Sequence, residues 1–166
     1  MNYMHPCRKN NYVYLNWLMK LCVKPFIFLL FFSCYNNSSN AAGVDTVSIG
    51  SKIMHKELKC IVIKPATYKK KKEFPVVYLL HGHSGWYANW ILRVPELKTW
   101  ADEYQLMIVC PDGGFNSWYV DSPVDSTVRF ETYIAKEVPA YIDAHYKTIK
   151  TRNGRAITGL SMGGHG

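Results

Sequence analysis

The chain has 166 residues, of which 48% are hydrophobic and 19% are charged, and its formal net charge is +8. This composition is ordinary for a globular protein, and the length suits a single domain. Four of the basic residues lie within positions 1–42 and four more form the lysine run at 69–72. A lysine run just before a strand is typical of a solvated loop, so the charge argues against a nucleic-acid partner.

Residues 1–42 are predicted to be a leader. The apolar run at 25–32 follows Lys20 and Lys24 and precedes a polar spacer. The run is too short to span a membrane, and its flanks are typical of a secretory signal peptide. We therefore expect export to the periplasm or the exterior, with no stable membrane span. Met19 is an alternative start, because it would give a leader of more usual length.

The end of the leader allows two kinds of processing. Small residues at 39–42 offer a cleavage site for a signal peptidase. The alternative is a lipoprotein signal in which Cys34 is lipidated, although the bulky Phe31 and Phe32 disfavour it.

Downstream of the leader, strand and helix patterns alternate. Apolar runs at 44–49, 58–63, 75–80, 106–110 and 156–158 predict strands, and the last three are expected to be buried. One helix is expected from Pro95, with Leu97, Trp100, Ala101 and Tyr104 on its inner face. A second is expected over 130–142, kinked or delayed by Pro139. This order predicts an α/β fold with a mostly parallel sheet flanked by helices. Cys60 and Cys110 lie within strands and are expected to be buried thiols rather than a disulfide.

Three glycine-containing loops follow the three buried strands: residues 81–83, 111–114 and 159–163. Because ligands of open parallel sheets bind at the carboxyl ends of the strands, these loops are expected to share one functional edge.

The third loop, Gly159-Leu160-Ser161-Met162-Gly163, fits the G-x-S-x-G pattern of a nucleophile elbow. A sharp turn between strand and helix would expose the Ser161 hydroxyl. Glycines at 159 and 163 would avoid clashes across that turn. The amide of Met162, at the start of the next helix, would face developing negative charge. Ser161 is therefore the predicted nucleophile.

The first loop is His81-Gly82-His83. Gly82 would let the backbone approach closely, so that the amide of His83 becomes the second oxyanion donor. The alternative is a metal site formed by His81 and His83. No further ligands occur at suitable spacing, so we expect no metal.

Aromatic and polar residues near the same edge are candidates for binding substrate. They are Trp118, Tyr119, Asp121 and Trp86. Aromatic faces beside polar groups suit a sugar or an aryl acyl group, but each residue could equally well be structural.

The segments VVYLLHGHSGWYANW, IVCPDGGFNSWYVDSP and AITGLSMGGHG, in this order and spacing, resemble the esterase D-like family of α/β-hydrolases. That family includes S-formylglutathione hydrolases, feruloyl and acetyl xylan esterases, and mycolyltransferases. The resemblance covers about residues 44–166. It implies a Ser-His-acid triad, no cofactor, and ester or thioester substrates. Ser161 would be the nucleophile, and the amides of His83 and Met162 would form the oxyanion hole.

The acid and histidine of such a triad follow the serine in the chain, and only five residues follow Ser161. His165 lies one helical turn away and should point elsewhere, while His81 and His145 precede the serine. We therefore interpret residues 43–166 as the N-terminal part of one α/β-hydrolase domain, truncated after the elbow and inactive alone.

The expected parent is an exported carboxylesterase acting on acylated carbohydrate, such as acetyl or feruloyl esters. The alternatives are an S-formylglutathione hydrolase-like thioesterase, an acyltransferase, or a non-catalytic fragment that binds carbohydrate or a cell surface. The oligomeric state stays open.

Overall fold

The computed structural model describes residues 41–71 and 73–166. Most of the predicted leader, including Met19 and Cys34, lies outside these residues. The strands are β1 (Gly43–Ser51), β2 (Lys56–Lys64), β3 (Val76–Leu80), β4 (Met107–Pro111) and β5 (Arg155–Gly159). The helices are α2 (Asn89–Arg93), α3 (Leu97–Glu103), α4 (Phe130–Thr132), α5 (Val138–His145) and α6 (Met162–His165). Short 3-10 turns form η2 (Ala66–Lys69) and η4 (Arg152–Gly154), and η3 (Tyr133–Glu137) is a π-helical segment.

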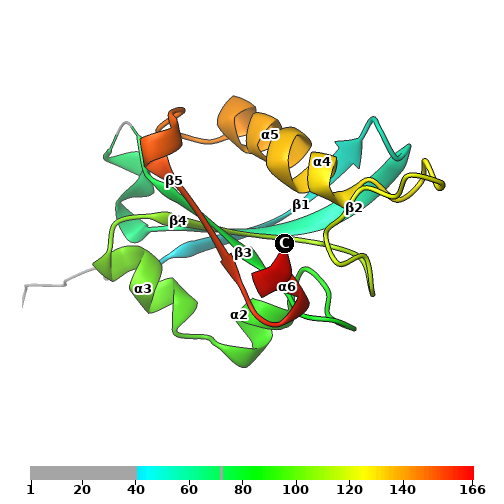
Figure 1. Cartoon of the computed structure of the whole chain (residues 1–166). Coiled ribbons are helices and arrows are strands. Elements are labelled where there is room, and N and C mark those ends of the chain that lie inside the picture. Colours follow the sequence, from blue (N-terminus) through cyan, green and yellow to red (C-terminus); the bar gives the residue numbers. More distant parts are fainter. Residues whose placement is uncertain (1–40, 72) are drawn as a thin grey trace, which may run out of the picture. The chain divides into compact units, whose positions relative to one another are not determined.

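The five strands form one twisted sheet in the order β1-β2-β4-β3-β5 (Figure 1). Strand β3 runs parallel to both β4 and β5, whereas β1 pairs antiparallel with β2, and β2 pairs antiparallel with β4. The α/β class is confirmed. The sheet is mixed, however, because β1 and β2 form a hairpin and only the strands separated by helical crossovers are parallel.

One face of the sheet is covered by the continuous segment α4-η3-α5 (Figure 1). Its inner residues Phe130, Ile134, Val138 and Ile142 are buried in the larger hydrophobic core, as predicted for this helix. Pro139 has no amide hydrogen for the usual helical bond, and the π-helical segment η3 comes just before it. The predicted irregularity is therefore a change in helical pitch.

The opposite face carries a smaller core beneath α2 and α3. Leu97 and Ala101 of α3 are buried, as predicted. Trp100 and Tyr104 lie on the same side of the helix, where they line an apolar pocket with Leu97 and with residues of the sheet, as the spacing predicts. They are not buried, however, since Trp100 is 43% and Tyr104 is 64% exposed.

Strand β5 lies at the edge of the sheet. Within the described residues it pairs only with β3, and Ile157 is 55% exposed. The predicted burial of residues 156–158 is therefore not observed. Cys60 and Cys110 are buried free thiols, as expected. None of the helices in the described region has the length and apolar character needed to cross a membrane.

Candidate active site

The loops after β3, β4 and β5 meet at one edge of the sheet. The amide of Gly113 donates to Nε2 of His81 at 2.8 Å, which joins the first loop to the second. The amide of Leu160 donates to the carbonyl oxygen of Leu80 at 3.3 Å, which joins the third loop to the first. The predicted convergence of the three loops is confirmed, and it follows from the parallel order of these strands.

Ser161 occupies a strained turn between β5 and α6. Its backbone angles are φ 54° and ψ −115°, a conformation that costs free energy for a residue with a side chain. A Cβ atom on Gly159 would lie 2.4 Å from the carbonyl oxygen of Gly163. A Cβ atom on Gly163 would lie 2.5 Å from the carbonyl oxygen of Leu80. Both glycines are therefore required by the close packing of this turn.

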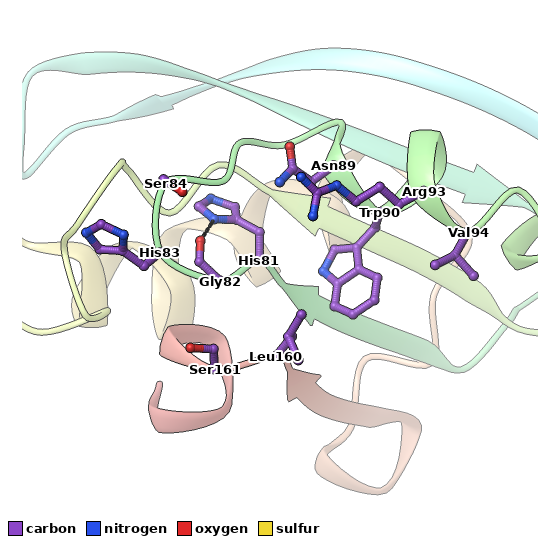
Figure 2. Close-up of a pocket in the computed structure, with 10 residues that line it drawn as sticks. All are labelled: His81, Gly82, His83, Ser84, Asn89, Trp90, Arg93, Val94, Leu160 and Ser161. Carbon is purple, nitrogen blue, oxygen red and sulfur yellow. Dashed lines mark hydrogen bonds between the residues drawn. The ribbon is translucent and has the colours of Figure 1, made fainter.

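A pocket of about 330 Å³ opens beside Ser161 (Figure 2). Its lining residues come from the loop after β3, from α2 and from the elbow. They are His81, Gly82, His83, Ser84, Asn89, Trp90, Arg93, Val94, Leu160 and Ser161. Trp90, Val94 and Leu160 give the pocket an apolar wall, and no carboxylate lines it.

The amides of His83, which lines the pocket, and of Met162, which follows Ser161, have no hydrogen-bond acceptor among the residues that the structure describes. The Ser161 hydroxyl also has no hydrogen-bond partner in this region. Gly82 brings its loop against the elbow, since a Cβ atom there would lie 3.3 Å from the carbonyl oxygen of Leu160. Free amides beside an exposed hydroxyl are the groups that could stabilise an oxyanion formed at Ser161.

His81 holds the loop in place. Because its Nε2 accepts the hydrogen bond from Gly113, the ring proton resides on Nδ1, which lies 2.9 Å from the carbonyl oxygen of Gly82. Both nitrogens of the ring are therefore engaged. Asp112 lies 3.9 Å from Nε2, too far for a hydrogen bond. The role of His81 as a positioning residue has no signal in the sequence, which suggested only the metal alternative.

None of the other described histidines contacts the Ser161 hydroxyl. Nδ1 of His165 lies 3.0 Å from the carbonyl oxygen of Trp118, and its ring packs edge-on against that indole. The ring of His83 packs against Phe115. Nδ1 of His145 contacts the carbonyl oxygen of Tyr141. None of these three histidines therefore makes a hydrogen bond to the Ser161 hydroxyl, and each ring has its neighbour elsewhere.

The four predicted substrate-binding residues differ in exposure. Tyr119 is only 4% exposed, and its hydroxyl donates to the carbonyl oxygen of His81 at 3.0 Å. Asp121 accepts hydrogen bonds from the amide and hydroxyl of Thr132, at 3.0 and 2.6 Å. The polar groups of Tyr119 and Asp121 therefore hold the chain itself together, which agrees with the structural alternative for these two residues. Trp118 and Trp86 are 49% and 44% exposed, but neither lines the pocket beside Ser161.

The pocket residues Asn89 and Arg93 were not predicted, because α2 was not predicted; Trp90 follows Trp86 in the sequence and has the same aromatic character. Helix α2 has five residues, too few for a detectable hydrophobic period. It contributes Asn89, Trp90 and Arg93 to the pocket. The Trp90 indole is fixed by a hydrogen bond from Nε1 to the carbonyl oxygen of Leu80 at 3.0 Å. Nothing in the local sequence distinguishes Arg93 from a surface arginine.

Comparison with known proteins supports this geometry. The model of the family described as "Putative esterase" matches residues 51–166. Esterase Rv1288 of Mycobacterium tuberculosis is 32% identical over 109 residues, which are 63% of this chain and 24% of that protein. An acetyl esterase of Caldicellulosiruptor saccharolyticus is 28% identical over 130 residues, which are 72% of this chain and 47% of that protein.

Solved structures agree with the sequence relatives. A ferulic acid esterase superposes with a TM-score of 0.66 and 31% identity, covering 76% of this chain and 51% of that one. An S-formylglutathione hydrolase and several diacylglycerol acyltransferase/mycolyltransferases are also similar. The chain spans about a quarter to a half of the length of the curated relatives quoted above. The match over residues 51–166 and the shared fold show that this chain belongs to the esterase family of α/β-hydrolases.

Proposed function

We propose that the whole protein is a serine carboxylesterase in which Ser161 is the nucleophile. The observation that carries this proposal is that three groups at one edge of the sheet have no hydrogen-bond partner among the described residues: the Ser161 hydroxyl, the amide of His83 in the same pocket, and the amide of Met162, the residue that follows Ser161. Ser161 and His83 are exposed, so the hydroxyl and the His83 amide are open to a ligand, and the Met162 amide begins the helix that follows the nucleophile.

In the proposed reaction, Oγ of Ser161 attacks the carbonyl carbon of the ester while a histidine takes its proton. The carbonyl oxygen becomes an oxyanion and accepts hydrogen bonds from the two free amides. Losing one such donor typically costs about 3–4 kcal/mol of transition-state stabilisation. The intermediate then expels the alcohol, which receives the proton from the histidine. Water cleaves the acyl-enzyme by the same steps in reverse order.

The proposal also assigns the missing base. None of the described histidines contacts Ser161, and in this fold the acid and the histidine follow the serine in the chain. We therefore place both residues in sequence beyond position 166. The partial coverage of the relatives supports this placement.

The substrate class we propose is acylated carbohydrate, such as acetyl or feruloyl esters. Two exposed indoles at the functional edge, Trp118 and Trp86, support it, because aromatic faces suit sugar rings and aryl acyl groups. The names of two similar proteins, an acetyl esterase and a ferulic acid esterase, point to the same class.

The direct experiment compares hydrolysis by the whole protein and by its Ser161→Ala variant. The substrates are 4-nitrophenyl acetate, acetylated xylo-oligosaccharide and methyl ferulate. Loss of a triad nucleophile lowers kcat by about a millionfold, so the variant should be indistinguishable from buffer. Retention of activity by a folded Ser161→Ala protein would contradict the proposed role of Ser161.

Export is part of the same proposal and has its own test. N-terminal sequencing of the protein from the cell envelope or culture medium should find a mature chain that begins at residue 42 or 43. Retention of residues 1–40 in the mature protein would contradict export by a cleaved signal peptide. A chain that begins with lipidated Cys34 would replace it with the lipoprotein alternative.

A further inference from the structure

The pocket beside Ser161 has a polar side that ester hydrolysis itself does not use. Ser84, Asn89 and Arg93 line it together with the nucleophile. Figure 2 shows Arg93 and Asn89 on one side of the pocket and Leu160 and Ser161 on the other. Asn89 and Arg93 are four residues apart on α2, which places both on the same face of that helix.

The polar atoms of these three side chains are unpaired within the described part of the chain. The Ser84 hydroxyl, the Asn89 amide and the Arg93 guanidinium have no hydrogen-bond partner there; Ser84 and Arg93 are exposed and Asn89 is half-buried, so all three can reach a ligand in the pocket. The guanidinium also lacks a carboxylate within 4 Å, in contrast to Arg129 and Arg155, which lie beside Asp121 and Asp143.

The pocket lining carries a positive charge that no acidic side chain of the lining offsets. Arg93 brings a permanent positive charge, and the lining contains no aspartate or glutamate. A guanidinium donates two parallel hydrogen bonds to a carboxylate. Amide or hydroxyl donors nearby can donate to the remaining lone pairs of the carboxylate oxygens. The apolar wall formed by Trp90, Val94 and Leu160 would contact the carbon chain or ring that carries this group.

We propose that Ser84, Asn89 and Arg93 form a carboxylate-binding subsite, so that the preferred ester carries a carboxylate near its scissile bond. This inference rests on the proposed function, because it concerns the substrate of the Ser161 pocket. The carboxylate has two chemical sources. It belongs either to a dicarboxylic acyl group or to an acidic sugar on the alcohol side.

The test uses matched pairs of esters with the whole protein. In the acyl arm, mono-4-nitrophenyl glutarate and adipate are compared with their neutral methyl esters. In the alcohol arm, an acetylated methyl glucuronoside is compared with the equally acetylated methyl glucoside. For each ester, the kcat/KM of the wild-type protein is divided by the kcat/KM of the arginine variant. The intrinsic reactivity of the ester cancels in this ratio.

Arg93→Gln should lower kcat/KM about tenfold for the carboxylate ester of at least one arm, as expected for one charge-assisted contact that is partly open to water. The neutral partner should change less than twofold. The arm that responds identifies the source of the carboxylate. Arg93→Lys should keep part of the preference, and 0.5 M NaCl should reduce it.

The matched control is Arg152→Gln. Arg152 is exposed in η4 and lies outside the pocket, and its substitution removes the same net charge. It should leave both members of each pair unchanged. Equal effects of Arg93→Gln on carboxylate and neutral esters in both arms would overturn the proposal, as would equal effects of the two arginine variants.

A protein that is not an esterase would give a different result from an esterase without this subsite. If no ester is hydrolysed, the subsite is tested by ligand-observed NMR with glutarate and glucuronate. Binding that is lost in Arg93→Gln and kept in Arg152→Gln would support the subsite without the esterase. Absence of binding to the wild-type protein would overturn it.

Discussion

Two regions at the same edge of the sheet use their polar groups in opposite ways. In the segment from Asp112 to Thr132, the side chains of Tyr119 and Asp121 donate or accept hydrogen bonds within the protein. In the pocket, the Ser161 hydroxyl and the Arg93 guanidinium have no such partners among the described residues. The polar groups of the first region therefore hold the edge together, whereas Ser161 and Arg93 are exposed and open to a ligand.

The largest expected effect on stability comes from a substitution in the elbow formed by residues 159–163. In Gly163→Ala, the new methyl group would lie 2.5 Å from the Leu80 carbonyl oxygen and 2.8 Å from that of His81. Both contacts are with backbone, which has little room to move, so we expect a loss of more than about 3 kcal/mol in the free energy of unfolding. Urea denaturation followed by circular dichroism measures it.

The neighbouring glycine is the control for this prediction. A Cβ atom on Gly164 would lie 3.4 Å from the carbonyl oxygen of Gly159, which is an ordinary contact. Gly164→Ala should therefore unfold at nearly the wild-type urea concentration. Equal losses for the two variants would show that the elbow is not constrained as described.

A smaller effect on stability is expected for the hydrogen bond that joins Tyr119 to the loop at His81. Tyr119→Phe removes the hydroxyl that donates to the carbonyl oxygen of His81 and leaves this buried acceptor without its donor. The expected loss in the free energy of unfolding is about 1–3 kcal/mol. Tyr104→Phe removes an exposed hydroxyl and should change stability by less than about 0.5 kcal/mol. If thermal melts rank the two variants the other way, Tyr119 does not brace the loop.

The third effect depends on pH. Partial desolvation acts to raise the pKa of Asp121, but the hydrogen bonds from Thr132 and the nearby Arg129 outweigh it and hold the pKa below its ordinary value. The folded state therefore binds this proton less tightly than the unfolded state. The stabilisation is present above the ordinary carboxyl pKa near 3.9 and is lost as the pH falls through the lowered value.

Asp121→Asn tests this dependence. Its free energy of unfolding should be about 1 kcal/mol lower at pH 7, and the difference from wild type should shrink as the pH falls from 5 to 2. Denaturant titrations at several pH values measure it. A constant difference over this range would mean that the charge of Asp121 does not contribute.

The smallest effect on stability is expected for Trp118→Ala. The indole is half exposed, so the free energy of unfolding should change by less than about 1 kcal/mol. If the indole stacks on a sugar or an aryl group, KM for acetylated xylo-oligosaccharide should rise about three- to tenfold. Unchanged KM for every carbohydrate ester would remove Trp118 from the proposed binding surface.

The elbow and the convergence of the loops could be predicted because their signals are local. The glycines on either side of Ser161 are required by close contacts within the elbow, and Gly82 marks a close approach in the same way. Residues 156–158 are predicted as a strand of the buried type, and within the described residues β5 has a pairing partner on one side only, so its exposure depends on its neighbours in the sheet and not on its own composition.

The contrast between Trp118 and Tyr119 could not be predicted either. The two residues are adjacent, both aromatic and both in the left-handed backbone region, yet one is exposed and the other is buried. Which of the two enters the core depends on the space beside Gly113, where a Cβ atom would overlap the Tyr119 ring. That space is set by tertiary packing, as is the position of Arg93 in the pocket.

The most direct test of the central claim is covalent labelling of the nucleophile. The whole protein is incubated with an alkyl fluorophosphonate, digested and analysed by mass spectrometry. A serine activated by a triad displaces fluoride and forms a stable phosphonyl ester. The account predicts one adduct, on the peptide that contains Ser161, suppressed by prior incubation with a slowly hydrolysed ester. A folded protein that stays unlabelled at Ser161, or is labelled only at another residue, would contradict it.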